Sequence, residues 1–222
     1  NLKLKDIEDM GIKTTAGDPI WAIDTINEIL IIALRGSTSE GKYEGKLAIV
    51  KDSSRTIMAV APETNEYGFT VRRFLEKNDG IIGINANAFI DSKGDGTTGN
   101  GTGKLDMAIG LVRHGSKTYH DKYGKEYYQM GGFDEDDNFL VGSGLKVSAL
   151  RDAGEFKPIL VANGTSRIFS KSDFGMGIQP RSAIGQTDKK ETMLIIIDGR
   201  NATGLGTTVA EVANILVRYN CW

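Results

Sequence analysis

Charged residues directly follow an apolar run near the C-terminal end of the sequence, in a pattern that could build a reactive site. Residues 193–197 are continuously apolar, and Asp198, Gly199 and Arg200 come immediately after them. A carboxylate at the end of a buried strand could act as an acid, a base, a nucleophile or a metal ligand, and the arginine could bind an anion. The alternative is a β-turn built on Asp-Gly. The residues alone leave both interpretations open.

Arg181 and Glu211 flank this segment along the chain. Arg181 follows Pro180 and precedes small residues, so its guanidinium could bind a phosphate or carboxylate, although a surface ion pair is the simpler interpretation. Glu211 stands three residues after Thr208 in the order Thr-Val-Ala-Glu. This is the capping-box pattern, in which the glutamate reaches back to the backbone amide of the cap residue. On the residues alone, we favour that cap for Glu211.

A third candidate site lies in the middle of the chain, in the sequence Asn-Ala-Asn-Ala-Phe. Asn85 and Asn87 are separated by a small residue, which would let a ligand approach the backbone while the amides donate and accept hydrogen bonds. The alternative is a turn that uses asparagine for an unusual backbone angle.

The sequence shows no dedicated metal site, and we expect neither a metal nor a cofactor. His114 and His120 are the only histidines, and they do not have the spacing of metal ligands. Residues 91–102 resemble a calcium loop faintly, but Lys93 stands at a ligand position and Thr102 replaces the final glutamate. The acidic residues 134–137 are most simply a solvated hairpin tip.

The composition is that of an ordinary globular protein. The 222 residues contain no linker, which predicts a single domain over residues 1–222 with a polar lead-in over residues 1–18. A net charge of −2 gives no electrostatic reason to expect a nucleic acid or an anionic membrane as partner. No apolar run approaches the length of a membrane span. Cys221 is the only cysteine, so an internal disulfide is impossible.

The hydrophobic pattern predicts many short strands and few helices. We expect a helix over residues 71–77, capped by Thr70, and another over residues 209–219. The predicted strands cover residues 29–34, 46–50, 56–60, 81–85, 108–112, 157–162 and 192–197, with a hairpin connection over residues 37–45. This pattern is typical of an α+β fold with a large mixed, mostly antiparallel sheet system.

The last strand, loop and helix form two thirds of a β-α-β unit. A parallel strand should follow within a few residues of the helix. Only Asn220, Cys221 and Trp222 follow it here. We therefore expect the last strand to be missing from this chain, and a second chain or a further segment to complete the unit.

Several of these motifs, taken in order, resemble those of the phosphodiester glycosidase family, which includes N-acetylglucosamine-1-phosphodiester alpha-N-acetylglucosaminidase and many bacterial relatives. The resemblance covers roughly residues 46 to 222. It rests on residues 46–52, 84–89, 161–164, 180–185 and 198–200, and on the glycine-containing loop that leads to Glu211. Family members continue after the last helix with an Asn-Leu-Asp-Gly-Gly-like strand, which corresponds to the expected missing segment. We expect a bacterial or phage member.

The resemblance implies hydrolysis of a sugar-1-phosphodiester in a surface or secreted glycan, and an extracellular or cell-surface location. It implies catalytic roles for Asp198 and Glu211, and substrate binding by Asn85, Asn87, Asn163, Arg181 and Arg200. Two other functions stay open. One is a non-catalytic carbohydrate- or phosphosugar-binding module for cell-surface or phage-tail adhesion, and the other is a metal-dependent phosphodiesterase.

Overall fold

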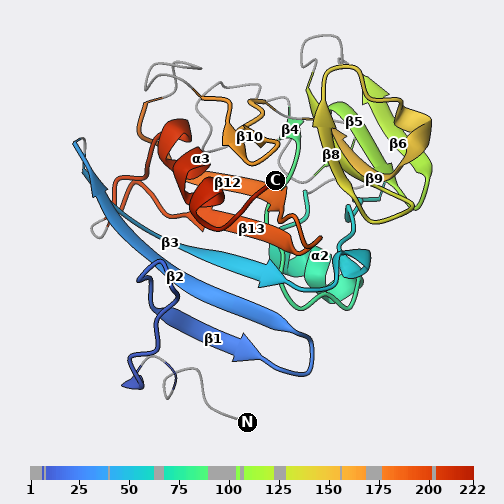
Figure 1. The fold of residues 1–222 in the computed structure, drawn as a ribbon. Helices are drawn as coiled ribbons and strands as arrows, with labels where there is room; N and C mark the ends of the chain where they lie inside the picture. Colours follow the sequence, from blue (N-terminus) through green and yellow to red (C-terminus); the bar gives the residue numbers. More distant parts are fainter. Residues whose placement is uncertain are drawn as a thin grey trace. The chain divides into compact units, whose positions relative to one another are not determined.

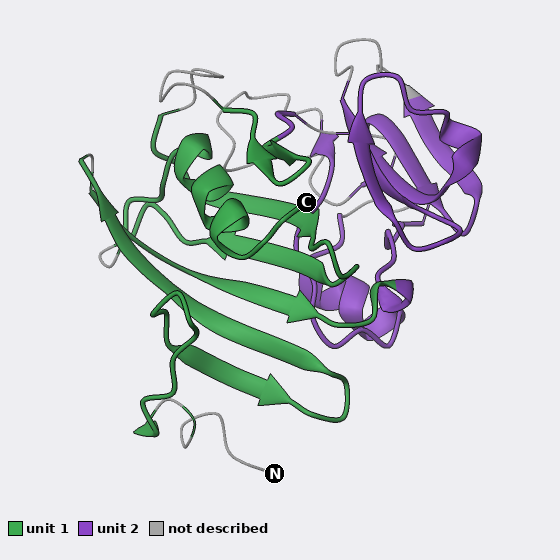
Figure 2. Ribbon diagram, viewed as in Figure 1, with its two compact units in different colours: residues 1–53, 160–222 green, residues 54–159 purple. Residues whose placement is uncertain are grey.

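The computed structural model describes residues 7, 9–39, 41–62, 68–89, 104–105, 108–122, 129–155, 157–168, 177–201 and 204–222. The chain divides into two compact units (Figures 1 and 2). The first unit combines Asn1–Ser53 with Leu160–Trp222, and the second is Ser54–Ile159. The single domain that the sequence predicts stays a prediction, and the two units are described separately below.

An antiparallel sheet of five strands forms the first unit, in the order β1-β2-β3-β13-β12 (Figure 1). The strands are β1 (Ile20–Asp24), β2 (Ile29–Thr38), β3 (Gly41–Val50), β12 (Arg181–Gln186) and β13 (Thr192–Ile197). Strands from the start of the chain therefore pair with strands from its end. This pairing brings the predicted C-terminal site residues next to β3.

Helix α3 (Val209–Arg218) packs against one face of this sheet. Successive side chains of a strand point to opposite faces, and in β13 this alternation buries Met193, Ile195 and Ile197 while Ile196 is exposed. The helix contributes Val212, Ile215 and Leu216 to the same core, at the spacing expected for one helical face. The core also contains Ile32, Leu34, Tyr43, Leu47, Val161 and Cys221.

Two short segments complete the first unit beside α3. Strands β10 (Val161–Ala162) and β11 (Thr165–Ser166) form a small hairpin. The end of the chain lies along β12, because Cys221 forms a bridge with Thr187 and the Trp222 N–H donates to the Gln186 carbonyl at 2.8 Å. A Cβ atom at Gly185 would lie only 2.8 Å from the Cys221 sulfur, so this close approach depends on the glycine.

The second unit is built around an antiparallel sheet of six strands. Its order is β4-β5-β9-β7-β8, with β6 paired to β5. The strands are β4 (Ala88–Phe89), β5 (Ala108–His114), β6 (Lys117–Lys122), β7 (Met130–Asp134), β8 (Phe139–Gly142) and β9 (Leu150–Glu155). Helix α2 (Val71–Lys77) and the short 3-10 turns η1 (Ser53–Arg55), at the junction with the first unit, and η3 (Val147–Ala149) are the remaining elements.

The predicted α+β fold with mostly antiparallel strands is confirmed. The helix over residues 71–77 and the strand over residues 192–197 have the predicted bounds, and Thr70 caps α2. The predicted connection over residues 37–45 is wrong in extent, because β2 runs to Thr38 and β3 starts at Gly41. Within that segment Tyr43 stands between the polar residues Lys42 and Glu44, and this alternation of apolar and polar residues is typical of a strand.

Three predicted strands are wrong in whole or in part. Residues 56–60 and 81–85 form no strand, and only Val161–Ala162 of the segment 157–162 does. Gly83 of the run at 81–85 lies close to α2, because a Cβ atom there would be 3.1 Å from the Leu75 side chain, but Ile81 of the same run is exposed. Periodicity alone does not identify the conformation of so short an apolar run. The loop at residues 91–102 lies outside the described residues.

Candidate functional site

One end of the five-stranded sheet brings together most of the predicted C-terminal site residues. Arg181 begins β12 and lies opposite Ile197, the last residue of β13. Asp198 follows Ile197 directly, and Ile197 lies opposite Gly45 of β3 on its other side. This register therefore places Arg181 and Asp198 near the start of β3, at the same end of the sheet.

Backbone hydrogen bonds hold the segments after β13 and before α3 against this end of the sheet. The Asp198 N–H donates to the Glu44 carbonyl at 2.9 Å, and the Thr207 N–H donates to the Gln179 carbonyl at 2.9 Å. Gly206 adopts a φ of +106°, and a Cβ atom there would lie 2.3 Å from the Gln179 oxygen. Only glycine fits this conformation and this approach, so Gly206 fixes the chain against Gln179 just before α3.

Arg181 is half-buried and oriented by two backbone carbonyls. Its Nε donates to the Thr207 oxygen at 3.0 Å and its Nη2 to the Gly177 oxygen at 2.7 Å. Burial lowers the pKa of Arg181 from its ordinary value, but a guanidinium stays charged at physiological pH. The result is a fixed cation at the start of β12.

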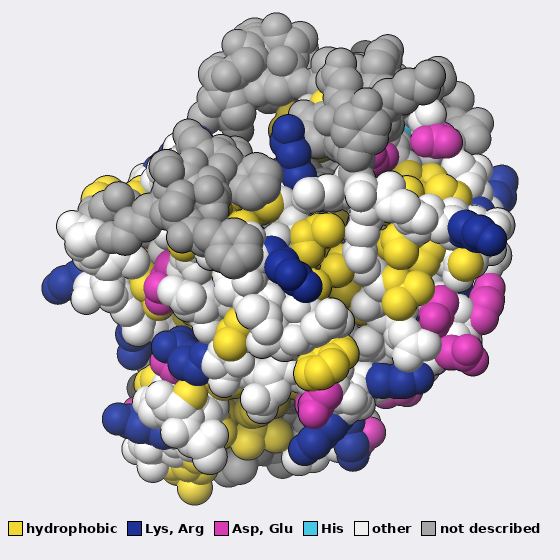
Figure 3. All heavy atoms as spheres, turned by 45° about the horizontal axis from the view of Figure 1, so that its top comes forward, with side chains coloured by type: hydrophobic (Ala, Val, Ile, Leu, Met, Phe, Trp, Pro, Cys, Tyr) yellow, Lys and Arg dark blue, Asp and Glu magenta, His cyan; other side chains and the backbone are white. Residues whose placement is uncertain are grey.

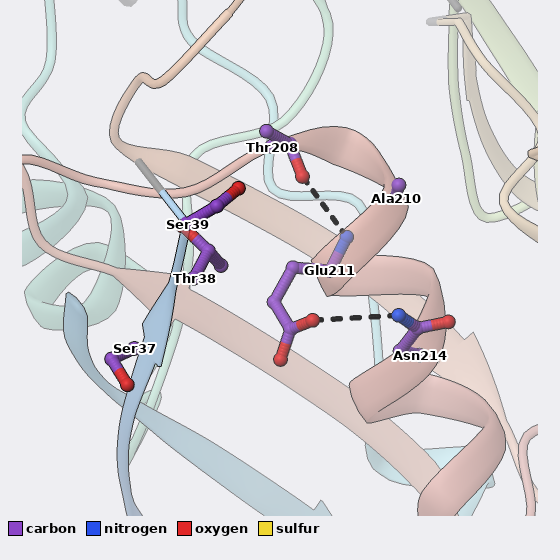
Figure 4. Close-up of a pocket in the computed structure, with 7 residues that line it drawn as sticks. All are labelled: Ser37, Thr38, Ser39, Thr208, Ala210, Glu211 and Asn214. Atoms are coloured by element: carbon purple, nitrogen blue, oxygen red, sulfur yellow. Dashed lines mark hydrogen bonds between the residues drawn. The ribbon is translucent and has the colours of Figure 1, made fainter. Parts of the chain in front are cut away.

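Glu211 is placed in the first turn of α3 by the Thr208 cap (Figure 4). The Thr208 Oγ1 accepts from the Glu211 N–H at 3.2 Å, which is the first half of the predicted capping box. The second half is wrong, because the carboxylate points away from the cap. Its Oε1 accepts from the Tyr43 hydroxyl at 2.8 Å and its Oε2 from the Asn214 amide at 3.4 Å.

The Glu211 carboxylate lines a pocket of about 250 Å³ between α3 and the end of β2 (Figure 4). The lining residues are Ser37, Thr38, Ser39, Thr208, Ala210, Glu211 and Asn214. Four of these seven carry a hydroxyl, one carries an amide and one carries a carboxylate. Hydroxyl, amide and carboxylate groups are the partners that a polyhydroxylated, uncharged ligand such as a sugar ring would need.

Sequence reasoning missed Tyr43, which contacts Glu211, and the pocket residues Asn214 and 37–39 at the end of β2. Asn214 lies three residues after Glu211, which is a distance at which helical side chains meet, so the helix pattern contained a signal for it. Residues 37–39 carried no comparable signal, because their position depends on which strand pairs with which.

Asp198 and Arg200 lie on the exposed surface directly after β13. Arg200 has a φ of +60°, which is uncommon for a residue other than glycine, and its Nη2 donates to the Gln179 Oε1 at 2.6 Å. The chain bends at Arg200, and no turn is assigned at Asp198 or Gly199. The segment presents an acidic and a basic side chain at the Arg181 end of the sheet. Their proposed roles stay predictions.

Asn163 is the remaining predicted residue of the first unit. It lies at the exposed tip of the β10–β11 hairpin with a φ of +54°, next to Gly164. A Cβ atom on Gly164 would be 3.3 Å from the Trp222 ring. This geometry explains an Asn-Gly turn, and the predicted role of Asn163 in substrate binding stays a prediction.

Asn85 and Asn87 belong to the second unit. The Asn87 amide nitrogen donates to the Leu111 carbonyl of β5 at 2.9 Å, and its Oδ1 accepts from the Glu155 N–H of β9 at 3.1 Å. With a φ of +59°, Asn87 has the unusual backbone angle that the turn interpretation requires. Asn87 therefore connects strands in the described structure, whereas Asn85 is exposed.

The second unit also contains a buried carboxylate that the sequence did not single out. Asp152 is 3% exposed, and its oxygens accept from the Met58 N–H and from Arg151, and lie 2.6 Å from the His114 ring. Within the described part of the chain, no three His, Cys, Asp or Glu side chains are grouped in a way that could hold a metal ion.

The described surface carries both signs of charge. On the face that Figure 3 shows, blue Lys and Arg side chains are spread among magenta Asp and Glu side chains. No helix in the described ranges is long and apolar enough to cross a membrane.

The model of the phosphodiester glycosidase family matches residues 78–222, which include every predicted site residue. The chain belongs to this family. The resemblance inferred from the ordered motifs is therefore confirmed. The chain has no significant sequence match among curated proteins.

Two solved structures share this fold. The catalytic domain of zebrafish N-acetylglucosamine-1-phosphodiester alpha-N-acetylglucosaminidase, auto-inhibited by its pro-peptide, is similar over 87% of this chain and 68% of its own, with a TM-score of 0.63 and 16% identity. A hypothetical protein from Synechocystis is similar over 91% of this chain and 56% of its own, with a TM-score of 0.67 and 12% identity. At these identities the likeness establishes the fold.

Proposed function

We propose that this phosphodiester glycosidase family member hydrolyses sugar-1-phosphodiesters. One observation carries the proposal: two consecutive residues, Thr207 and Thr208, orient a cation at the start of β12 and cap the first turn of the helix that carries a carboxylate. The Thr207 carbonyl orients the Arg181 guanidinium, and the Thr208 hydroxyl caps the helix turn that carries Glu211. A substrate with an anionic phosphate and a neutral sugar needs these two kinds of group side by side.

The two halves of the substrate have different places in this proposal. Arg181 and Arg200 bind the phosphodiester anion, for which a guanidinium has well-matched geometry. The sugar ring occupies the pocket beside Glu211, whose wall of hydroxyl and amide groups suits ring hydroxyls. The pocket is large enough for a single ring at about 250 Å³, which favours recognition of the terminal sugar.

In the proposed reaction, water adds across the bond between the anomeric carbon and the phosphate oxygen. The products are a reducing sugar and a phosphate monoester of the acceptor. Glu211 and Asp198 provide the two carboxyl groups that such a displacement uses for acid, base or nucleophile duty. Arg181 stabilises the negative charge of the departing phosphate.

The direct test is turnover of a synthetic N-acetylglucosamine-1-phosphate methyl diester, with the glucose and galactose analogues as comparisons. We expect release of reducing sugar by the wild type, and a loss of at least about 100-fold in kcat for Glu211→Gln and Asp198→Asn. Arg181→Lys should mainly raise KM, because lysine keeps the charge but loses the planar fork. Performing the reaction in ¹⁸O-labelled water identifies the cleaved bond, since the proposal places the label in the sugar.

Matched controls separate chemistry from folding. Glu191→Gln makes the same change at the opposite end of β12 and β13, where Glu191 accepts a hydrogen bond from Thr187. Arg218→Lys makes the arginine change at the far end of α3, where Arg218 pairs with Asp18. Both variants should keep wild-type kinetics. No turnover of any diester by the folded wild type would refute the hydrolase proposal.

Two other outcomes have distinct signatures. Saturable binding of the same diesters without product would indicate a carbohydrate-binding module, and activity that a chelator abolishes would indicate a metal-dependent phosphodiesterase.

We also propose that the physiological substrate is a cell-surface or secreted glycan. We further propose that another segment, from this protein or from a second chain, adds a strand next to β12. A segment that continues the direction of Cys221 and Trp222 would run antiparallel to β12, past Ile184 and Ser182.

A further inference from the structure

The Glu211 carboxylate is held from outside its own helix, by a tyrosine of the neighbouring sheet. Tyr43 lies in β3 with only 3% of its surface exposed, and its hydroxyl donates to the Glu211 Oε1 at 2.8 Å. A tyrosine hydroxyl has a single proton to donate, and here that proton is directed at Glu211. The two residues are 168 positions apart in the sequence.

A glycine on the adjacent strand makes room for this tyrosine. Gly36 of β2 lies opposite Tyr43 in the β2–β3 pairing. A Cβ atom at Gly36 would lie 2.4 Å from the Tyr43 hydroxyl oxygen and 2.5 Å from the ring carbon that bears it. Any side chain at position 36 would therefore displace the phenol and move its hydroxyl away from Glu211.

The protonation state of Tyr43 is also defined. Burial raises the pKa of Tyr43 above its ordinary value, and the hydrogen bond to Glu211 and the charge of that carboxylate raise it further. Tyr43 thus remains protonated over the whole physiological range and can act only as a neutral donor.

We propose that Tyr43 is a positioning residue for the reaction, which directs the Glu211 carboxyl group into the pocket, and that Gly36 permits this arrangement. This inference rests on the proposed function of the same site.

The test is Tyr43→Phe, which removes one oxygen and keeps the ring in the core. We expect kcat to fall by about 10- to 100-fold while KM changes by less than about 3-fold, because a misplaced reacting group affects the chemical step more than binding. Tyr219→Phe is the matched control. Tyr219 also donates its hydroxyl to a carboxylate, that of Asp18, but just beyond the opposite end of α3, so its loss should leave kcat unchanged.

Gly36→Ala tests the same contact from the other side. It should reduce kcat as Tyr43→Phe does, and the double variant should be no slower than the slower single variant, because both changes remove one interaction. Additive losses would show that Gly36 and Tyr43 act independently and would overturn that part of the proposal.

Crystal structures of the wild type and Tyr43→Phe provide a readout that does not require turnover. We expect the Glu211 carboxylate to occupy a different position in the Tyr43→Phe variant, and an unchanged position would overturn the proposal. It is also overturned if Tyr43→Phe keeps the wild-type kcat while Glu211→Gln is inactive. If the wild type cleaves no diester, the proposed function fails, and the crystal structures still decide the role of Tyr43 in placing Glu211.

Discussion

The Thr208 hydroxyl should contribute to both stability and catalysis, and substitution of this residue separates the two. Thr208 is buried, and its Oγ1 accepts from the Glu211 N–H at 3.2 Å. Thr208→Ala removes this cap, at a cost of about 1 kcal/mol, and a buried methyl group, at a cost of up to about 0.8 kcal/mol. We therefore expect the free energy of unfolding to fall by about 1 to 2 kcal/mol.

Thr208→Ser separates the two contributions, because serine keeps the hydroxyl and loses only the methyl group. Its expected cost is at most about 0.8 kcal/mol, so the difference between the two variants measures the cap. Both tryptophans, Trp21 and Trp222, belong to the first unit. Tryptophan fluorescence during urea unfolding therefore reports on the unit that contains Thr208.

Thr70→Ala is the matched control in the second unit. Thr70 caps α2 in the same way, and its Oγ1 accepts from the Arg73 N–H, also at 3.2 Å. Thr70 is exposed, so the expected loss is the cap alone, about 1 kcal/mol, measured by circular dichroism. Only Thr208→Ala should also reduce kcat, because only that cap carries Glu211. Equal stability of Thr208→Ala and Thr208→Ser, or full activity of Thr208→Ala, would refute the reasoning.

Three further predictions address the two sheets. Gly45→Ala should abolish soluble expression, because its Cβ atom would lie 2.2 Å from a backbone oxygen of β13, whereas Gly144→Ala, which meets no atom within 4 Å, should stay within about 0.5 kcal/mol of the wild type. Asn87→Ala should lower the free energy of unfolding by about 2 kcal/mol through its lost hydrogen bonds, and Asn85→Ala should not; equal stability of the two variants would contradict the connecting role of Asn87. Burial raises the pKa of Glu155 above its ordinary value, so the folded state binds more protons than the unfolded state and stability falls as the pH rises through the folded pKa. Glu155→Gln should flatten this fall in urea titrations from about pH 4 upward, and an unchanged slope would count against it.

The sequence was most informative where a structural signal is local. The cap residues Thr70 and Thr208, the helices they begin and the strand Thr192–Ile197 depend on residues within one or two turns of each other. The ordered motifs also indicated the family, which its model confirms. The sequence failed at residues 81–85, which form no strand, because periodicity alone does not identify the conformation of so short an apolar run.

The candidate site depends on a different kind of information. By itself the sequence determined that Asp198 directly follows a strand and that Glu211 lies in a capped first turn. Only the tertiary structure decided that Glu211 faces Tyr43 rather than its own cap, and that Asn87 connects two strands. The physical reason is that these contacts join residues far apart in the chain. The Tyr43–Glu211 contact requires β3 to pair with β13, and the Asn87 contacts require β5 to pair with β9. Local propensity and hydrophobic periodicity do not determine which strands pair with one another.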